Sequence, residues 1–133
     1  YNVIKNRNGR SVAGLSMGGG QSFYVCFRNP GMFAWMGSFS SGLLGGTKGG
    51  VSAEDFDAEK QVPGTFSNPK VAAGMRLAYF SCGESDQRIG GIRQVSEEFE
   101  SKGFPVVFES YAGGHEWHVW RQSLASFAKR LFK

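Results

Sequence analysis

Short apolar stretches separated by polar and glycine-rich segments are the main feature of the hydrophobic pattern. Four of them have the length of a buried strand, and runs such as Leu77 to Phe80 fit that interpretation. We expect strands at residues 10–15, 33–39, 76–82 and 105–111. Glycine clusters fall between these stretches, which indicates sharp turns and close approaches of the backbone.

Helical patterns follow the first and third predicted strands. A helix is expected from residue 17 to about residue 28, where Asn29-Pro30-Gly31 is a strong stop signal. A second helix is expected at residues 89–102. Its apolar face carries residues at helical spacing, namely Ile92, Val95 and Phe99.

The last helical pattern covers residues 117–132. Its apolar face is made by Trp120, Leu124, Phe127 and Leu131. The region from residue 40 to about residue 71 is instead rich in glycine, polar residues and acids. We interpret it as a long loop with one short helix that starts at Ser52. Within it, residues 43–66 are a candidate wall of a substrate crevice.

Strand and helix alternate along the whole chain. Such alternation implies parallel strands joined by right-handed crossovers. The predicted fold class is therefore α/β, with about four parallel strands alternating with helices. The length of 133 residues fits one ordinary domain, and no break in composition suggests a linker, so we expect a single domain over residues 1–133.

Composition and charge exclude several classes of protein. Hydrophobic residues make up 41% of the chain and charged residues 20%, as in a folded domain rather than a disordered tail. No apolar run approaches the ~20 residues of a membrane span. The net charge is +4 with scattered basic residues, so neither nucleic acid nor membrane is expected as a partner. Cys26 and Cys82 suit buried thiols better than a disulfide framework, and no metal site is expected.

The first motif with chemical meaning is Gly14-Leu15-Ser16-Met17-Gly18, a G-x-S-x-G sequence between a predicted strand and a predicted helix. A nucleophilic serine needs a strained turn that lifts its hydroxyl clear of the sheet, and the flanking glycines let strand and helix pass closely. The start of the following helix favours a developing oxyanion. Ser16 is thus the candidate nucleophile, and the Met17 backbone N–H is a candidate oxyanion donor.

The candidate base is His115, in a glycine-rich loop after the fourth predicted strand. A serine hydroxyl is a poor nucleophile until a base takes its proton, and histidine does so near neutral pH. His118 is the alternative, but it falls within the predicted helix. His115 is preferred because a loop at a strand end can bring its imidazole over the edge of the sheet.

The candidate acid is Asp86, shortly after the third predicted strand, with Glu84 in the same loop as the alternative. Its role is to hold the imidazole in the correct tautomer. The order Ser16, Asp86, His115 is that of α/β-hydrolase triads. All three follow strand ends, where ligand crevices form in parallel sheets.

These motifs resemble the esterase D/putative-esterase family of α/β-hydrolases. The resemblance rests on residues 14–19, 82–86 and 113–120, and it extends from Val12 to Phe132. The family includes the feruloyl and acetylxylan esterases of carbohydrate esterase family 1, and its relatives include enterochelin esterases and mycolyltransferases. The G-G-H-x-W-x-x-W ending is a rather specific marker of the carbohydrate-esterase branch.

The resemblance implies a serine esterase that needs no cofactor, with Ser16 as nucleophile, Asp86 as acid and His115 as base. It implies feruloyl or acetyl esters on xylan-type plant polysaccharide or its oligosaccharides as substrates, and a secreted enzyme. Acyl transfer to an alcohol, as in the mycolyltransferase branch, is the enzymatic alternative. Trp117 either borders the acyl pocket or packs under the histidine loop.

The family normally has a long segment before the nucleophile strand, which supplies half of the sheet and the second oxyanion N–H. The chain is therefore expected to form the C-terminal half of the fold, without the N-terminal half. The strand at residues 10–15 then lies at an unpaired apolar edge. This unpaired edge and the incomplete oxyanion hole suggest an alternative to the esterase prediction. In that alternative, the chain is a half-domain that is inactive alone and acts with a separate N-terminal half or as a strand-swapped homodimer.

Overall fold

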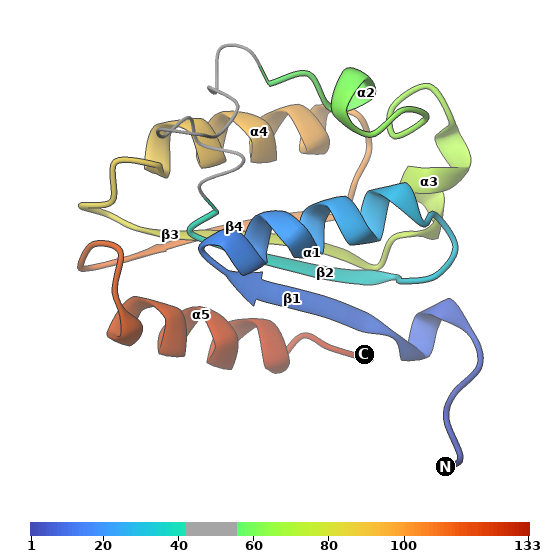
Figure 1. The fold of residues 1–133 in the computed structure, drawn as a ribbon, viewed down its shortest axis with the longest axis horizontal. Helices are drawn as coiled ribbons and strands as arrows, with labels where there is room; N and C mark the ends of the chain where they lie inside the picture. Colours follow the sequence, from blue (N-terminus) through green and yellow to red (C-terminus); the bar gives the residue numbers. More distant parts are fainter. Residues whose placement is uncertain (42–55) are drawn as a thin grey trace.

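Four parallel strands form one sheet in the order β1-β2-β3-β4 (Figure 1). The computed structural model describes residues 1–41 and 56–133 of the chain. Its strands are β1 (Ser11–Leu15), β2 (Trp35–Phe39), β3 (Leu77–Gly83) and β4 (Val106–Tyr111). The parallel pairing confirms the prediction from alternating strands and helices, and it brings the carboxyl ends of all four strands to one edge.

The three long helices begin where the sequence predicts them. They are α1 (Met17–Arg28), α4 (Ile89–Ser101) and α5 (Trp117–Ala128). A 3-10 helix, η1 (Arg7–Gly9), precedes β1. The prediction of helix up to residue 132 is wrong, since α5 ends at Ala128 and turns follow. Phe132 has a φ of 59°, which an α-helix cannot accommodate.

The connection between β2 and β3 contains two short helices, α2 (Ala58–Gln61) and α3 (Pro69–Gly74). The helix start predicted at Ser52 lies outside the described residues. Helix α3 was not predicted, although Asn68-Pro69 has the chemistry of a helix start. The Asn68 side chain accepts from the Lys70 N–H at 3.1 Å, and proline suits the first helical position.

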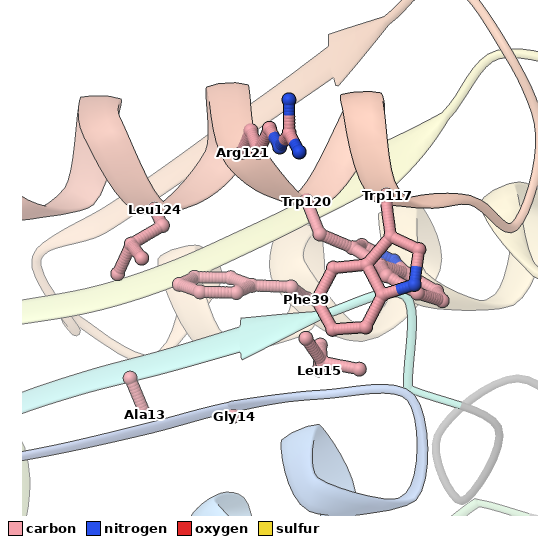
Figure 2. Close-up of a pocket in the computed structure, with 8 residues that line it drawn as sticks. All are labelled: Ala13, Gly14, Leu15, Phe39, Trp117, Trp120, Arg121 and Leu124. Atoms are coloured by element: carbon pink, nitrogen blue, oxygen red, sulfur yellow. The ribbon is translucent and has the colours of Figure 1, made fainter.

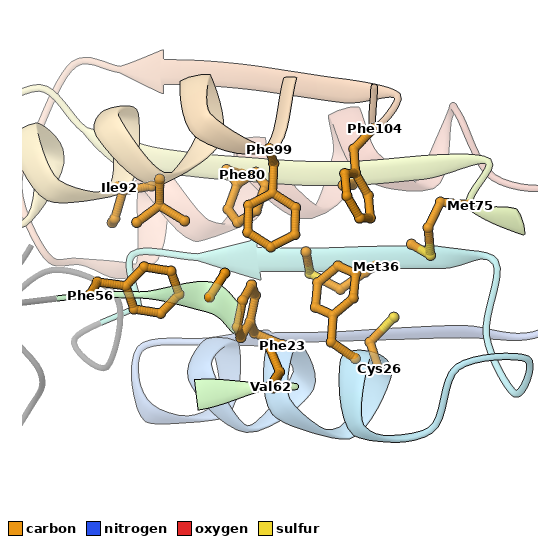
Figure 3. Close-up of a cluster of buried hydrophobic side chains, with 14 of the residues drawn as sticks. Phe23, Cys26, Met36, Phe56, Val62, Met75, Phe80, Ile92, Phe99 and Phe104 are labelled. Carbon is orange, nitrogen blue, oxygen red and sulfur yellow. The ribbon is translucent and has the colours of Figure 1, made fainter. Parts of the chain in front are cut away.

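One face of the sheet is covered by α1 and α4 (Figure 1). Between them lies a cluster of buried aromatic and aliphatic side chains (Figure 3). Phe56, Ala58 and Val62 belong to it, so the described part of the loop at 43–66 packs against this core. The rest of that predicted crevice wall lies outside the described residues. Both cysteines are free and buried, as predicted.

The opposite face of the sheet is covered by α5 (Figure 1). Its cluster of buried residues is smaller, and Trp120 and Leu131 are partly buried against it, in agreement with the predicted apolar face. Leu124 is the exception, because 55% of it is exposed. The periodicity places it correctly on the apolar side of the helix, but nothing among the described residues covers it. None of the described helices is long and apolar enough to span a membrane.

Candidate active site

Ser16 occupies a sharp turn between β1 and α1. Its φ of 53° and ψ of −123° are unusual for a residue with a side chain, which is the strain expected of an exposed nucleophile. Its backbone N–H donates to the Phe39 carbonyl at 2.7 Å, which ties the turn to β2. A Cβ at Gly14 would collide with the Gly18 carbonyl. The first glycine of the motif is thus required by the close approach of the helix to the strand.

Ser16, His115 and Asp86 form a hydrogen-bonded chain. The Asp86 carboxylate accepts from His115 Nδ1–H at 2.7 Å. Because a carboxylate only accepts, this contact places the proton of a neutral imidazole on Nδ1 and leaves Nε2 as an acceptor. The Ser16 hydroxyl donates to that Nε2 at 2.8 Å. The three residues therefore have the geometry of a nucleophile, a base and an orienting acid.

The loops that carry Asp86 and His115 touch through their backbones. The Glu84 N–H donates to the Tyr111 carbonyl at 2.8 Å, and the Ser85 N–H donates to the Gly113 carbonyl at 2.9 Å. A Cβ at Gly83 would collide with the carbonyl oxygens of Gly113 and Gly114. A glycine at position 83 therefore lets the acid loop and the histidine loop pack side by side.

Asp86 is 3% exposed, and its charge is compensated by several donors. Burial alone raises the pKa of this carboxyl, but hydrogen bonds from Arg88 and His115 outweigh burial and lower the pKa overall. The Arg88 backbone N–H and Nη1 each donate to Asp86 Oδ1 at 3.0 Å. Asp86 is consequently ionised and available to stabilise an imidazolium. Arg88 is not among the residues predicted for the site, although Asp-x-Arg at a helix start is a usable sequence signal.

The alternatives to Asp86 and His115 lie elsewhere. Glu84 is exposed and makes no side-chain contact with an imidazole among the described residues. His118 faces two acceptors of its own loop: Nδ1 is 2.8 Å from Glu116 Oε1, and Nε2 is 2.9 Å from the Ala112 carbonyl oxygen. The structure thus brings together the preferred acid and the preferred base.

The candidate oxyanion donor lies at the start of α1. Met17 is the first residue of this helix, so its N–H has no acceptor within the helix and remains available to a ligand. The Met17 side chain itself is exposed. A second donor is not identified among the described residues. In the same part of the chain, no group of three or more His, Cys, Asp or Glu side chains is placed to hold a metal ion.

A groove of about 250 Å³ runs between β1 and α5 (Figure 2). It is almost entirely apolar, and its lining comprises Ala13, Gly14, Leu15, Phe39, Trp117, Trp120, Arg121 and Leu124. Trp117 is 66% exposed, and its ring stacks edge-on against Trp120 at 5.2 Å between centroids. Trp120 in turn meets the His115 ring at 4.9 Å. Trp120 therefore lies between the groove and His115.

Comparison with known proteins shows the family to which the chain belongs. The family model described as "Putative esterase" matches residues 2–131. A curated relative, an endo-1,4-beta-xylanase/feruloyl esterase of Xylanibacter ruminicola, is 30% identical over 125 residues, which cover 93% of this chain and 14% of that protein.

Solved structures show the same fold. The chain is similar to a ferulic acid esterase (TM-score 0.74, 22% identity, 95% of this chain and 52% of that one). It is also similar to the Staphylococcus aureus fluorophosphonate-binding serine hydrolase FphF (TM-score 0.74, 18% identity, 98% of this chain and 57% of that one). A third similar structure is the S-formylglutathione hydrolase FrmB of Staphylococcus aureus (TM-score 0.73, 17% identity, 98% of this chain and 54% of that one). The chain spans about half the length of these structures. It belongs to the putative esterase family and has the α/β-hydrolase type of sheet, of which it forms about half.

Proposed function

We propose that this chain carries the catalytic residues of a serine esterase. The observation that carries the proposal is the hydrogen-bonded chain of Ser16, His115 and Asp86 at the carboxyl ends of β1, β4 and β3, in a member of an esterase family. Each partner is already within hydrogen-bond distance in the unliganded protein. Little rearrangement is therefore needed before proton transfer.

In the proposed reaction, Ser16 Oγ attacks the acyl carbonyl while His115 Nε2 takes the hydroxyl proton. Asp86 stabilises the resulting imidazolium, and the Met17 N–H donates to the oxyanion. The imidazolium then protonates the leaving alcohol, and an acyl-enzyme ester remains on Ser16. Water, deprotonated by His115, then attacks this ester. The acid leaves as Ser16 Oγ takes the proton back from the imidazolium, and the starting state is restored.

The proposed substrates are feruloyl or acetyl esters on xylan-type plant polysaccharide or its oligosaccharides. The supporting facts are that a relative is described as a xylanase/feruloyl esterase and that a structural neighbour is described as a ferulic acid esterase. A polymeric substrate of this kind is cleaved outside the cell, so the proposal includes secretion. Trp117 remains a predicted pocket residue. Its place in the groove beside Trp120 is compatible with contact to an aromatic acyl group.

The triad is tested by covalent labelling, which reads the nucleophile directly. A fluorophosphonate should add to Ser16, as seen by intact mass and peptide mapping, because only an activated serine reacts. Ser16→Ala should abolish the label, and His115→Gln should slow labelling by at least about 10³-fold. His118→Gln is the matched control and should label at the wild-type rate. Equal loss in the two histidine variants contradicts the assignment of His115 as base.

Substrate class is tested by product analysis. Methyl ferulate, acetylated xylan and a nitrophenyl ester are compared, with Ser16→Ala as the blank. Free ferulate or acetate is the expected product, and it should remain the main product when acceptor sugars are added. An acylated sugar as the main product would instead identify an acyltransferase. Turnover of the nitrophenyl ester alone, without either natural ester, contradicts the proposed substrates.

A second proposal concerns association, and the groove between β1 and α5 favours it. Strand β1 pairs with β2 alone among the described strands, so its other side offers unpaired backbone donors and acceptors. The exposed apolar side chains of Trp117 and Leu124 lie along the same side. The solved relatives contain about as many residues again as this chain covers. We infer that a strand and a helix of a complementary half-domain cover this groove.

Sedimentation and kinetics together test the second proposal. The chain by itself should be a monomer that labels at Ser16 yet hydrolyses esters about 10²–10³-fold below an ordinary esterase, because the described residues supply one oxyanion donor, the Met17 N–H. A concentration-dependent dimer would identify a second copy as the occupant instead. A monomer with an ordinary kcat/KM, above about 10⁴ M⁻¹s⁻¹, would show that the site needs no further segment.

A further inference from the structure

The two oxygens of the Asp86 carboxylate have different partners. Oδ2 accepts from His115 Nδ1 at 2.7 Å. Oδ1 accepts from both the backbone N–H and Nη1 of Arg88, each at 3.0 Å. Two donors from a single residue thus hold one oxygen, which fixes the rotation of the carboxylate and directs the other oxygen at the imidazole.

We propose that Arg88 is a positioning residue that sets how strongly Asp86 acts on His115. This rests on the proposed function in that it assigns His115 as the base. Arg88 does not touch Ser16 or the oxyanion site in the described structure, so it acts through Asp86. Its side chain is 22% exposed and that of Asp86 is 1% exposed, so their ion pair is poorly screened by solvent.

The backbone around Arg88 explains why its donors reach Asp86. Arg88 is the residue at the N-cap position of α4, with φ −83° and ψ −11°. The Asp86 N–H donates to the Gly83 carbonyl at 3.1 Å, and the Asp86 carbonyl accepts from the Ile89 N–H at 3.1 Å. Asp86 therefore lies in the turn that precedes α4. Because Arg88 follows two residues later at the N-cap position, its backbone N–H and its side chain can both reach the Asp86 carboxylate.

The charge of Arg88 has a predictable effect on the base. A guanidinium on Oδ1 offsets part of the carboxylate charge that stabilises imidazolium on Oδ2. Removing it leaves the full charge of Asp86 facing His115, so the imidazole holds its proton to higher pH. The groups that face Asp86 and His115 are the Cys82 thiol from β3, Arg88, Ser16 and the Trp120 ring, while Glu116 and His118 pair with each other.

The test follows the titration of the two histidines by NMR in Arg88→Gln and in wild type. We expect the midpoint of His115 to rise by about 0.5–1 pH unit in this variant, while His118 titrates as before. Arg93→Gln is the matched control. It removes the same charge from an exposed position on α4, where Arg93 lies over the Phe108 ring. Its effect on His115 should be within about 0.2 pH unit.

Arg88→Lys separates charge from geometry. Lysine keeps the positive charge but lacks the guanidinium plane that places Nη1 on Asp86 Oδ1, so the His115 midpoint should stay near the wild-type value while fluorophosphonate labelling at pH 8 slows several-fold. This variant also decides the matter if Arg88→Gln does not fold, since an unchanged labelling rate overturns the proposal. An unchanged His115 midpoint in folded Arg88→Gln also overturns it.

These outcomes are distinct from failure of the proposed function. The NMR titration needs no turnover, so it reports on Arg88 even if no ester is hydrolysed. Absence of labelling and turnover, with the expected change in the His115 midpoint, would leave the role of Arg88 intact and count against the esterase assignment. Normal labelling with an unchanged His115 midpoint would support the esterase assignment and count against the proposed role of Arg88.

Discussion

The two faces of the sheet are held by different kinds of contact. Beneath α1 and α4, Phe99 is the centre of an aromatic cluster, with ring centroids 4.8–5.9 Å from those of Phe23, Phe27, Phe66, Phe80 and Phe104. Beneath α5, Phe127 contacts two aromatic rings, those of Phe39 and Tyr79. The first face is thus a continuous apolar core, and the second has a smaller one.

Polar contacts supplement the apolar ones on the α5 face. The Ser81 hydroxyl donates to Ser123 Oγ at 2.8 Å in the buried interior. Glu109 accepts from the hydroxyls of Tyr79, Tyr111 and Ser126, and its other oxygen accepts from Arg130 at 2.6 Å. Helix α5, which follows the His115 loop, is therefore attached by directional and titratable contacts beside an open groove.

The largest expected effect on the free energy of unfolding is that of a substitution in the aromatic cluster beneath α1 and α4. Phe99→Ala should lower the free energy of unfolding by about 3–5 kcal/mol, because it removes a fully buried ring with five aromatic neighbours. Phe127→Ala is the matched variant on the α5 face and should cost distinctly less, since its apolar surroundings are smaller. Urea unfolding followed by circular dichroism measures both. An equal or greater loss for Phe127→Ala would show that the two faces are packed alike.

An intermediate effect is expected from Glu109, and it depends on pH. Partial burial raises its pKa, but hydrogen bonds from three hydroxyls and the charge of Arg130 lower the pKa of Glu109 to about 2. Since this lies below the value of an unfolded glutamate, the carboxylate stabilises the folded chain above about pH 4.5. That contribution is lost as the pH falls towards 2. Glu109→Gln should therefore cost about 1–2 kcal/mol at pH 7 and progressively less below pH 4.5.

Hydrogen exchange localises the Glu109 effect. Between pH 4.5 and 3, after correction for intrinsic exchange rates, α5 should lose protection in the wild-type chain before α1 and α4 do. Glu100→Gln, at an exposed position on α4, serves as the control. Loss of protection spread evenly over all three helices would mean that Glu109 does not attach α5 in particular.

The smallest expected effect on the free energy of unfolding is that of a substitution in the groove between β1 and α5. Leu124→Ala should change the free energy of unfolding of the chain alone by no more than about 0.5 kcal/mol, because the side chain is already 55% exposed. Val119→Ala on the same helix is the buried counterpart and should cost about 1–3 kcal/mol. A cost for Leu124→Ala close to that for Val119→Ala would show that the groove is covered in solution.

Much of the fold was predictable because its signals are local. Apolar runs and the stop signal at Asn29-Pro30-Gly31 mark the elements within a few residues of their ends. The helix α3 was missed because a short helix in a polar loop has no apolar period, and only Asn68-Pro69 marks its start. The predicted helix at residues 117–132 extends beyond the observed end of α5 at Ala128, because the apolar spacing continues to Leu131 although the backbone is no longer helical there.

The candidate site was predictable in part, since the G-x-S-x-G turn and the glycine-rich histidine loop are themselves local patterns. The choice between Asp86 and Glu84 rested only on distance from the strand end. In the structure, the Asp86 side chain is buried against His115, whereas Glu84 in the same loop is exposed. The spacing of Asp86 and Arg88 at a helix start makes their ion pair possible, but whether it forms depends on the rotamer of a long side chain.

The residues that form parallel strands, and those that lie at strand ends, follow from local patterns, because period and turn chemistry act over a few residues. The contact between Ser16 and His115, 99 residues apart, depends on the order β1-β2-β3-β4, which brings their side chains to 2.8 Å. The open groove beside Leu124 is likewise a result of the tertiary arrangement. Periodicity shows which side chains share a face of a helix, but what covers that face depends on elements distant in the sequence.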